Sequence, residues 1–144
     1  MTNSPLLAPI VALVAWSILI LFWMVIVRLP AMKKAGIDLN TRVGSTPGAL
    51  DGAIDAKAQW KAHNYIHLME QPTIFYAIVF ALILMGADYR LNVLLAWGYV
   101  ALRIAHSIVQ ATWNRILARF ILFALSTLCL LGLTLHAAIQ LLHG

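Results

Sequence analysis

Leu6–Leu29 reads LLAPIVALVAWSILILFWMVIVRL, and Arg28 is the only charged side chain in this run. About 20 mainly apolar residues are enough for an α-helix to cross the hydrocarbon core of a bilayer. No basic residue precedes the run, and its apolar part is longer than the core of a secretory signal peptide. We therefore expect this segment to remain in the protein as a membrane span.

The rest of the chain contains three further segments of this kind, at about 59–85, 91–113 and 118–142. The composition agrees, because 62% hydrophobic and 10% charged residues leave too little polar surface for a soluble globule of 144 residues. The connections after the second and third segments are short, so successive helices should run antiparallel. We expect one all-α integral membrane domain over 1–144, an up-down bundle of four transmembrane helices.

Lysine and arginine are distributed unevenly along the chain. Most of them lie in or beside the long first loop, about 30–58, and the short third loop, whereas the second loop holds only Arg90. The positive-inside rule then predicts that loops one and three are cytoplasmic and that both termini are periplasmic. The style of the sequence favours a bacterial inner membrane. We therefore attribute the net charge of +5 to the orientation of the protein in the membrane and to contact with membrane lipids. We do not expect a nucleic acid as partner.

The second and third predicted helices each carry a polar face where lipid contact would be expected. The spacing of three and four residues places each set on one side of its helix. Ionisable groups inside a span are costly, so such faces point to a bundle interior, a cavity or a partner subunit. The side chains are His63, Asn64, His67, Glu70 and Gln71 in one helix, and Arg103, His106, Ser107 and Gln110 in the other.

These faces have more than one interpretation. They can bind a polar ligand, or they can hold the helices together through hydrogen bonds. Glu70 and Arg103 should reach similar depths, which predicts either a direct ion pair or one shared ligand. His63 and His67 have the spacing of metal ligands. The third helix adds only one histidine and there is no His-Glu-x-x-His motif, so we expect no metal.

The same residues resemble a known family. The stretch from Lys61-Ala62-His63-Asn64 to Glu70-Gln71-Pro72-Thr73-Ile74-Phe75, and the stretch RIAHSIVQ at 103–110, are similar to the MAPEG family. This family comprises membrane-associated proteins in eicosanoid and glutathione metabolism. The resemblance extends over most of the chain in span count and loop lengths.

The resemblance implies a homotrimer that binds glutathione as co-substrate between helices of adjacent subunits. Arg119 falls on the arginine that holds the glutathione sulfur as a thiolate, since a permanent cation favours the charged form of a thiol. A lipophilic substrate would enter from the bilayer. The residues expected to bind the tripeptide are Asn64, His63, His67, Glu70, Arg103, His106, Gln110 and Arg115.

The helix-two motif of the family, Asn-x-x-Glu, is altered in this chain. Anchoring on Lys61-Ala62-His63 and Pro72 puts Tyr65 and Leu68 at the two positions, whereas anchoring on Asn64 puts His67 at the glutamate position. Both registers stay open at the level of sequence. Gln110 replaces a tyrosine and Phe120 a serine of the family's prostaglandin synthase, which argues against that activity.

Three functions compete on this reading. The first is a glutathione-dependent transferase or peroxidase that acts on lipophilic electrophiles or lipid hydroperoxides. The second is a non-catalytic lipid-binding or scaffolding protein of the same fold. The third is a homologue that binds another thiol or an anionic metabolite.

Overall fold

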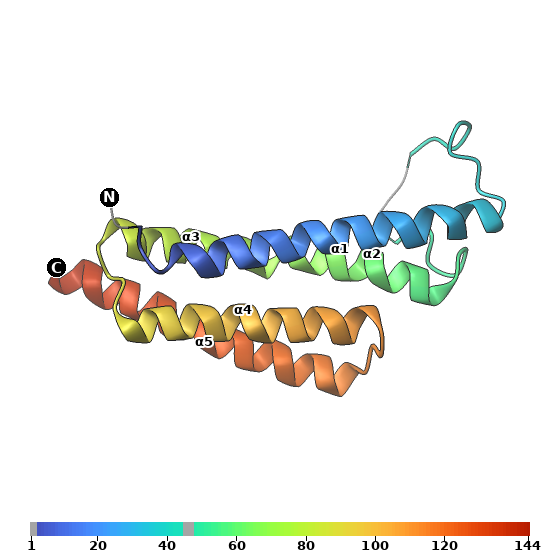
Figure 1. Cartoon of the computed structure of the whole chain (residues 1–144). Helices are drawn as coiled ribbons and strands as arrows, with labels where there is room; N and C mark the ends of the chain where they lie inside the picture. Colours follow the sequence, from blue (N-terminus) through green and yellow to red (C-terminus); the bar gives the residue numbers. More distant parts are fainter. Residues whose placement is uncertain (1–2, 45–47) are drawn as a thin grey trace.

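The computed structural model describes residues 3–44 and 48–144, and the regular structure in these residues is helical (Figure 1). The pair α2 and α3 forms one span, so the described residues contain four segments that are long and apolar enough to cross a membrane. This confirms the predicted all-α, four-span fold. The helices are α1 (Leu7–Lys34), α2 (Ala56–Leu68), α3 (Gln71–Leu84), α4 (Arg90–Ala111) and α5 (Ile116–His143).

Helix α1 is longer than the predicted first span, because it continues through Pro30 to Lys34. Its 28 residues extend for about 42 Å at a rise of about 1.5 Å each, whereas the hydrocarbon core measures about 30 Å. One end of α1 must therefore reach the headgroup region. The long loop begins only after Lys34, and its residues 45–47 lie outside the described residues.

The second span is broken, although the sequence was expected to form one continuous helix there. Helix α2 ends at Leu68 and α3 starts at Gln71. Pro72 accounts for the break, because it has no N–H for the Leu68 carbonyl and its ring collides with that carbonyl. Both the backbone N–H and the hydroxyl of Thr73 bond to the carbonyl of Glu70, which begins the new helix.

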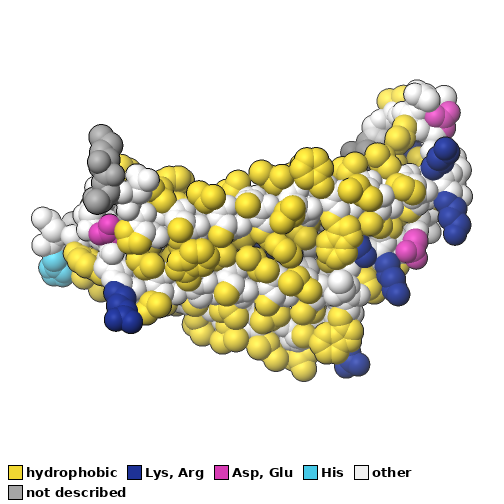
Figure 2. Space-filling model, viewed as in Figure 1, with side chains coloured by type: hydrophobic (Ala, Val, Ile, Leu, Met, Phe, Trp, Pro, Cys, Tyr) yellow, Lys and Arg dark blue, Asp and Glu magenta, His cyan; other side chains and the backbone are white. Residues whose placement is uncertain are grey.

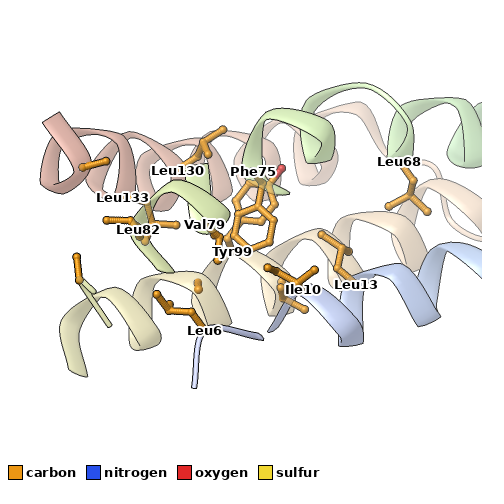
Figure 3. Packing of buried hydrophobic residues seen from close by; sticks show 14 of the residues in the cluster. Leu6, Ile10, Leu13, Leu68, Phe75, Val79, Leu82, Tyr99, Leu130 and Leu133 are labelled. Atoms are coloured by element: carbon orange, nitrogen blue, oxygen red, sulfur yellow. The ribbon is translucent and has the colours of Figure 1, made fainter. Parts of the chain in front are cut away.

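The larger of two apolar clusters, whose packing Figure 3 shows, lies mainly in the half of the bundle opposite the long loop. The smaller cluster packs at the loop end and consists of Met32, Leu50, Ile54 and Ala58. Phe75 of α3 stacks on Tyr99 of α4, with ring centroids 4.2 Å apart. Leu13 of α1 and Leu133 of α5 are also fully buried in the larger cluster. The polar faces of α2 and α4 are thus displaced towards the other half, where the long loop lies.

The outer surface matches a membrane protein (Figure 2). In this view hydrophobic side chains cover the middle of the molecule, and lysine and arginine gather at its ends, mostly at the end that carries the long loop. The start of α1 and the end of α5 lie together at the opposite end (Figure 1). An apolar belt with basic ends is the arrangement that a bilayer requires.

Candidate functional site

Polar side chains converge where α2, α4 and α5 meet, in the half of the bundle near the long loop. Arg103 of α4 is completely buried, with no exposed surface. Its guanidinium carbon lies 5.9 Å from the centroid of the Phe123 ring on α5. A permanent cation at such a position requires a structural or functional reason, because burying a charge is costly.

Arg103, His67 and Glu70 form a chain of hydrogen bonds. Arg103 Nη1 lies 3.4 Å from His67 Nε2, and His67 Nδ1 lies 3.4 Å from Glu70 Oε2. A guanidinium only donates, so Nε2 must accept and the ring proton must be on Nδ1, where it points to the carboxylate. The neutral imidazole of His67 therefore connects the Arg103 guanidinium to the Glu70 carboxylate through two hydrogen bonds.

The direct ion pair expected between Glu70 and Arg103 is absent. Among the described residues, the two ion pairs within 4.0 Å join His63 to Asp51 and His67 to Glu70. The imidazole of His67 stands between the two charges. The Glu70 side chain is 62% exposed, so its carboxylate faces the surface and leaves Arg103 without a carboxylate in direct contact.

The break between α2 and α3 supplies a second contact for Arg103. In an uninterrupted helix the His67 carbonyl would accept the N–H of Gln71. Here it accepts the backbone N–H of Glu70 and, at 3.4 Å, Nη2 of Arg103. The helix break thus presents a backbone oxygen to the buried guanidinium.

The side chain of Asn64 on α2 takes part in a contact between three helices, which is centred on the hydroxyl of Ser107 on α4. Its Nδ2 donates to Ser107 Oγ at 2.7 Å, and Trp16 Nε1 of α1 donates to the same oxygen at 2.9 Å. Asn64 Oδ1 and Gln110 Oε1 are buried, and neither has a hydrogen-bond partner. Such acceptors are costly to bury and are available to a donor from outside the chain.

Arg119 lies at the start of α5 and borders a pocket of about 260 Å³. Its Nη1 donates to Asn114 Oδ1 at 2.7 Å, whereas its Nε is buried with no partner. Asn114 adopts a left-handed backbone (φ 53°), a conformation that asparagine tolerates better than most residues. The pocket is lined by His67, His106, Ile116, Arg119, Phe120 and Phe123.

A second pocket, of about 340 Å³, adjoins the first at His67 and reaches the long loop. Asp51 of the loop closes one side, since its Oδ1 lies 2.9 Å from both Gln59 Nε2 and His63 Nε2. These two hydrogen bonds hold the pKa of Asp51 below its usual value. Glu70 and Gln110 also line this pocket. Its hydrogen-bond acceptors are therefore two carboxylates, of Asp51 and Glu70, and the neutral amide of Gln110.

Most of the predicted site residues meet in these two pockets or directly behind them, but Arg115 does not. It is exposed, and its guanidinium lies 5.0 Å from the centroid of the Trp113 ring. Among the described residues, no three His, Cys, Asp or Glu side chains are placed to hold a metal ion.

Several residues that contribute to the site were not predicted from the sequence. Asn114 accepts a hydrogen bond from Arg119; helical spacing from Gln110 places it at the end of the polar face of the third predicted helix, but it was given no role in the site. Asp51 comes from an irregular loop, and no periodic pattern could pair it with α2. Phe123 and Trp16 lie in apolar runs without a polar pattern, and only the packing of α5 and α1 brings them to the site.

Comparison with known proteins gives one family. The model of the MAPEG family matches residues 6–139, which is nearly the whole chain. Among curated proteins and among solved structures, no match was found.

Proposed function

Because the chain belongs to the MAPEG family, we propose that it is a membrane-bound, glutathione-dependent transferase or peroxidase. Its substrates would be lipophilic electrophiles or lipid hydroperoxides that enter from the bilayer. The family is generally connected with glutathione, and the two adjoining pockets offer a polar and an aromatic compartment.

The observation that carries the proposal is a pair of arginines with unused hydrogen-bonding capacity. Arg103 and Arg119 each have a buried Nε without a partner, and neither lies within 4.0 Å of a carboxylate among the described residues. Guanidinium groups bind carboxylates and thiolates in preference to neutral groups. An anionic ligand such as glutathione would bond to Arg119, which borders the first pocket, and would be attracted by the positive charge of Arg103 behind His67.

Arg119 would stabilise the nucleophile. A free thiol with a pKa of about 8.5 is mostly protonated at neutral pH, and a cation beside the sulfur favours the thiolate. In the transferase reaction the thiolate sulfur forms a bond to an electrophilic carbon while the leaving group departs with its electron pair. Phe120 and Phe123 would provide the apolar wall for that carbon's substituents.

The remaining residues would bind the tripeptide. Arg103, which lies directly behind His67, would attract a glutathione carboxylate, and Glu70 would accept the glutathione amino group. Asn64, His63, His106 and Gln110 would contribute neutral hydrogen bonds. The partnerless oxygens of Asn64 and Gln110 support this assignment.

The packing also bears on the register of the helix-two motif. Leu68 lies in the apolar core with 1% exposed surface, whereas Asn64 and His67 contact α4 through Ser107 and Arg103. The register that aligns Asn64 and His67 with the family's Asn and Glu keeps polar groups on the site side. We propose that register.

Purified protein in detergent tests the proposal directly. We expect glutathione to bind at millimolar concentration or below, and the protein to conjugate a chlorinated nitrobenzene or reduce an organic hydroperoxide. No binding at millimolar glutathione would refute the proposal. Binding without turnover would instead favour the non-catalytic, lipid-binding alternative.

A further inference from the structure

We propose that the end of α1 and the adjoining loop form a binding site for an anionic phospholipid. The site lies outside the two pockets described above. It joins two hollows around the last turns of α1, one basic and one mainly apolar. These match, respectively, the phosphate and the acyl chain of a lipid.

The basic hollow contains Arg28 and Arg42, and it measures about 170 Å³. Arg28 Nε is buried with no hydrogen-bond partner. Neither arginine has a carboxylate oxygen within 4.0 Å among the described residues. The charge of Arg28 does contribute a small part of the lowering of the Asp51 pKa. Two guanidinium groups facing one hollow are well suited to hold a phosphate.

The larger hollow continues along α1 and measures about 680 Å³. Leu29, Ile37 and Leu39 line it, and Leu39 is 60% exposed. Lys33 also lines it, as does Asp38, whose Oδ1 accepts the backbone N–H of Asn40. An exposed apolar groove beside cations fits an acyl chain better than it fits a soluble anion.

Position along the membrane selects a lipid as the occupant. The apolar part of α1 ends at Arg28, so this residue should lie near the headgroups, and the last turns of α1 extend beyond it. From Arg28 to Gly44 the chain carries four cations (Arg28, Lys33, Lys34 and Arg42) and one carboxylate, Asp38. Basic clusters at this depth attract anionic headgroups.

Native mass spectrometry of the whole protein can measure this preference. The probes are phosphatidylglycerol and phosphatidylcholine with identical acyl chains. We expect the first bound molecule of phosphatidylglycerol to have a lower Kd than the first bound molecule of phosphatidylcholine. Replacing Arg28→Gln and Arg42→Gln together should weaken phosphatidylglycerol roughly 25-fold, at about fivefold for each basic group, and leave phosphatidylcholine unchanged.

The matched control removes two charges elsewhere. Lys57→Gln with Arg90→Gln should change the phosphatidylglycerol Kd less than twofold, since both residues lie outside the two hollows. Lys33→Gln with Lys34→Gln changes only exposed side chains, so it keeps the test valid if the arginine variant fails to fold. That variant should also weaken phosphatidylglycerol selectively.

Three results would overturn the proposal. The first is equal affinity for the two lipids in the wild type. The second is an equal loss in the control and the arginine variants, which would mean nonspecific charge attraction. The third is binding of glycerol phosphate, which has no acyl chain, as tightly as phosphatidylglycerol, which would make the site one for a soluble phosphate.

Discussion

Arg119 and Arg103 show how one residue type can take two roles in the same bundle. Arg119 is partly exposed at a helix start and borders open space, whereas Arg103 is sealed between helices. Asn114 accepts from one donor nitrogen of Arg119 and His67 contacts two of Arg103, and each arginine keeps a buried Nε without a partner. Arg119 is therefore placed for direct contact with a bound thiolate, whereas Arg103 can act on a ligand only through its charge and through His67.

We predict that Arg119→Ala lowers turnover about 100-fold, because it removes the donor that stabilises the developing thiolate charge. The ultraviolet band of bound thiolate should disappear, while glutathione binding falls by less than tenfold. Arg119→Lys should be intermediate, since it keeps the charge and loses the forked geometry. The control is Arg90→Ala, which changes an exposed residue at the opposite end of the bundle. Wild-type turnover in Arg119→Ala would contradict the role assigned to Arg119.

Asp51 should titrate below its ordinary value of 3.8, because Gln59 and His63 donate hydrogen bonds to its charged form. The contact therefore contributes to stability above pH 3.8 and is lost as the pH falls through the lowered pKa of Asp51. Carbon-13 NMR of the Asp51 carboxyl measures the midpoint. Gln59→Leu should raise the midpoint most and His63→Leu less, and a wild-type midpoint at or above 3.8 would rule the contact out.

At the scale of elements, two features determine how the helices form the site. A single hydroxyl on α4 ties α1 to α2, and a proline divides the second span into α2 and α3. The first fixes how three helices are rotated against one another. The second frees a carbonyl for Arg103.

Ser107→Ala should destabilise the fold by roughly 1–3 kcal/mol, because the buried donors of Asn64 and Trp16 lose their shared acceptor. Unfolding in sodium dodecyl sulfate, followed by circular dichroism, measures the loss. The control is Thr134→Val, which removes an exposed hydroxyl that bonds only within its own helix. An equal effect of the two substitutions would show that Ser107 is not a tie between helices.

Pro72→Ala should join α2 and α3 into one helix, because alanine restores the N–H that the Leu68 carbonyl lacks. The His67 carbonyl would then turn to Gln71 and release Arg103. We expect slower amide hydrogen exchange at residues 68–73 together with several-fold weaker glutathione binding. Pro9→Ala, in the first turn of α1, is the control; slower exchange with unchanged affinity would show that the break does not serve the site.

At the scale of the whole molecule, the four spans leave large apolar side chains on the outside, which lipid or other subunits must cover. Arg115 is also directed outwards, away from the two pockets of its own chain. We predict that in a homotrimer Arg115 contributes to the site of a neighbouring subunit. Trimer assembly and the cytoplasmic position of loops one and three remain predictions.

We predict three chains per particle by analytical ultracentrifugation in density-matched detergent. Arg115→Ala and Arg119→Ala should each be nearly inactive alone. Co-expressed, they should regain part of the activity, because some sites then combine Arg115 of one subunit with Arg119 of another. Separately purified trimers mixed afterwards provide the baseline, and no gain on co-expression would mean that Arg115 does not act across subunits.

The four spans follow from the sequence alone, because lipid offers no hydrogen bonds to the backbone and a long apolar run must therefore be helical. The sequence also located the polar faces, since helical periodicity follows from spacing alone. Three features of the site depend on how the helices pack: His67 separates Glu70 from Arg103, Asp51 closes a pocket, and Arg115 faces outwards. These pairings depend on how the helices are shifted and rotated against one another, which the periodicity of one helix does not specify.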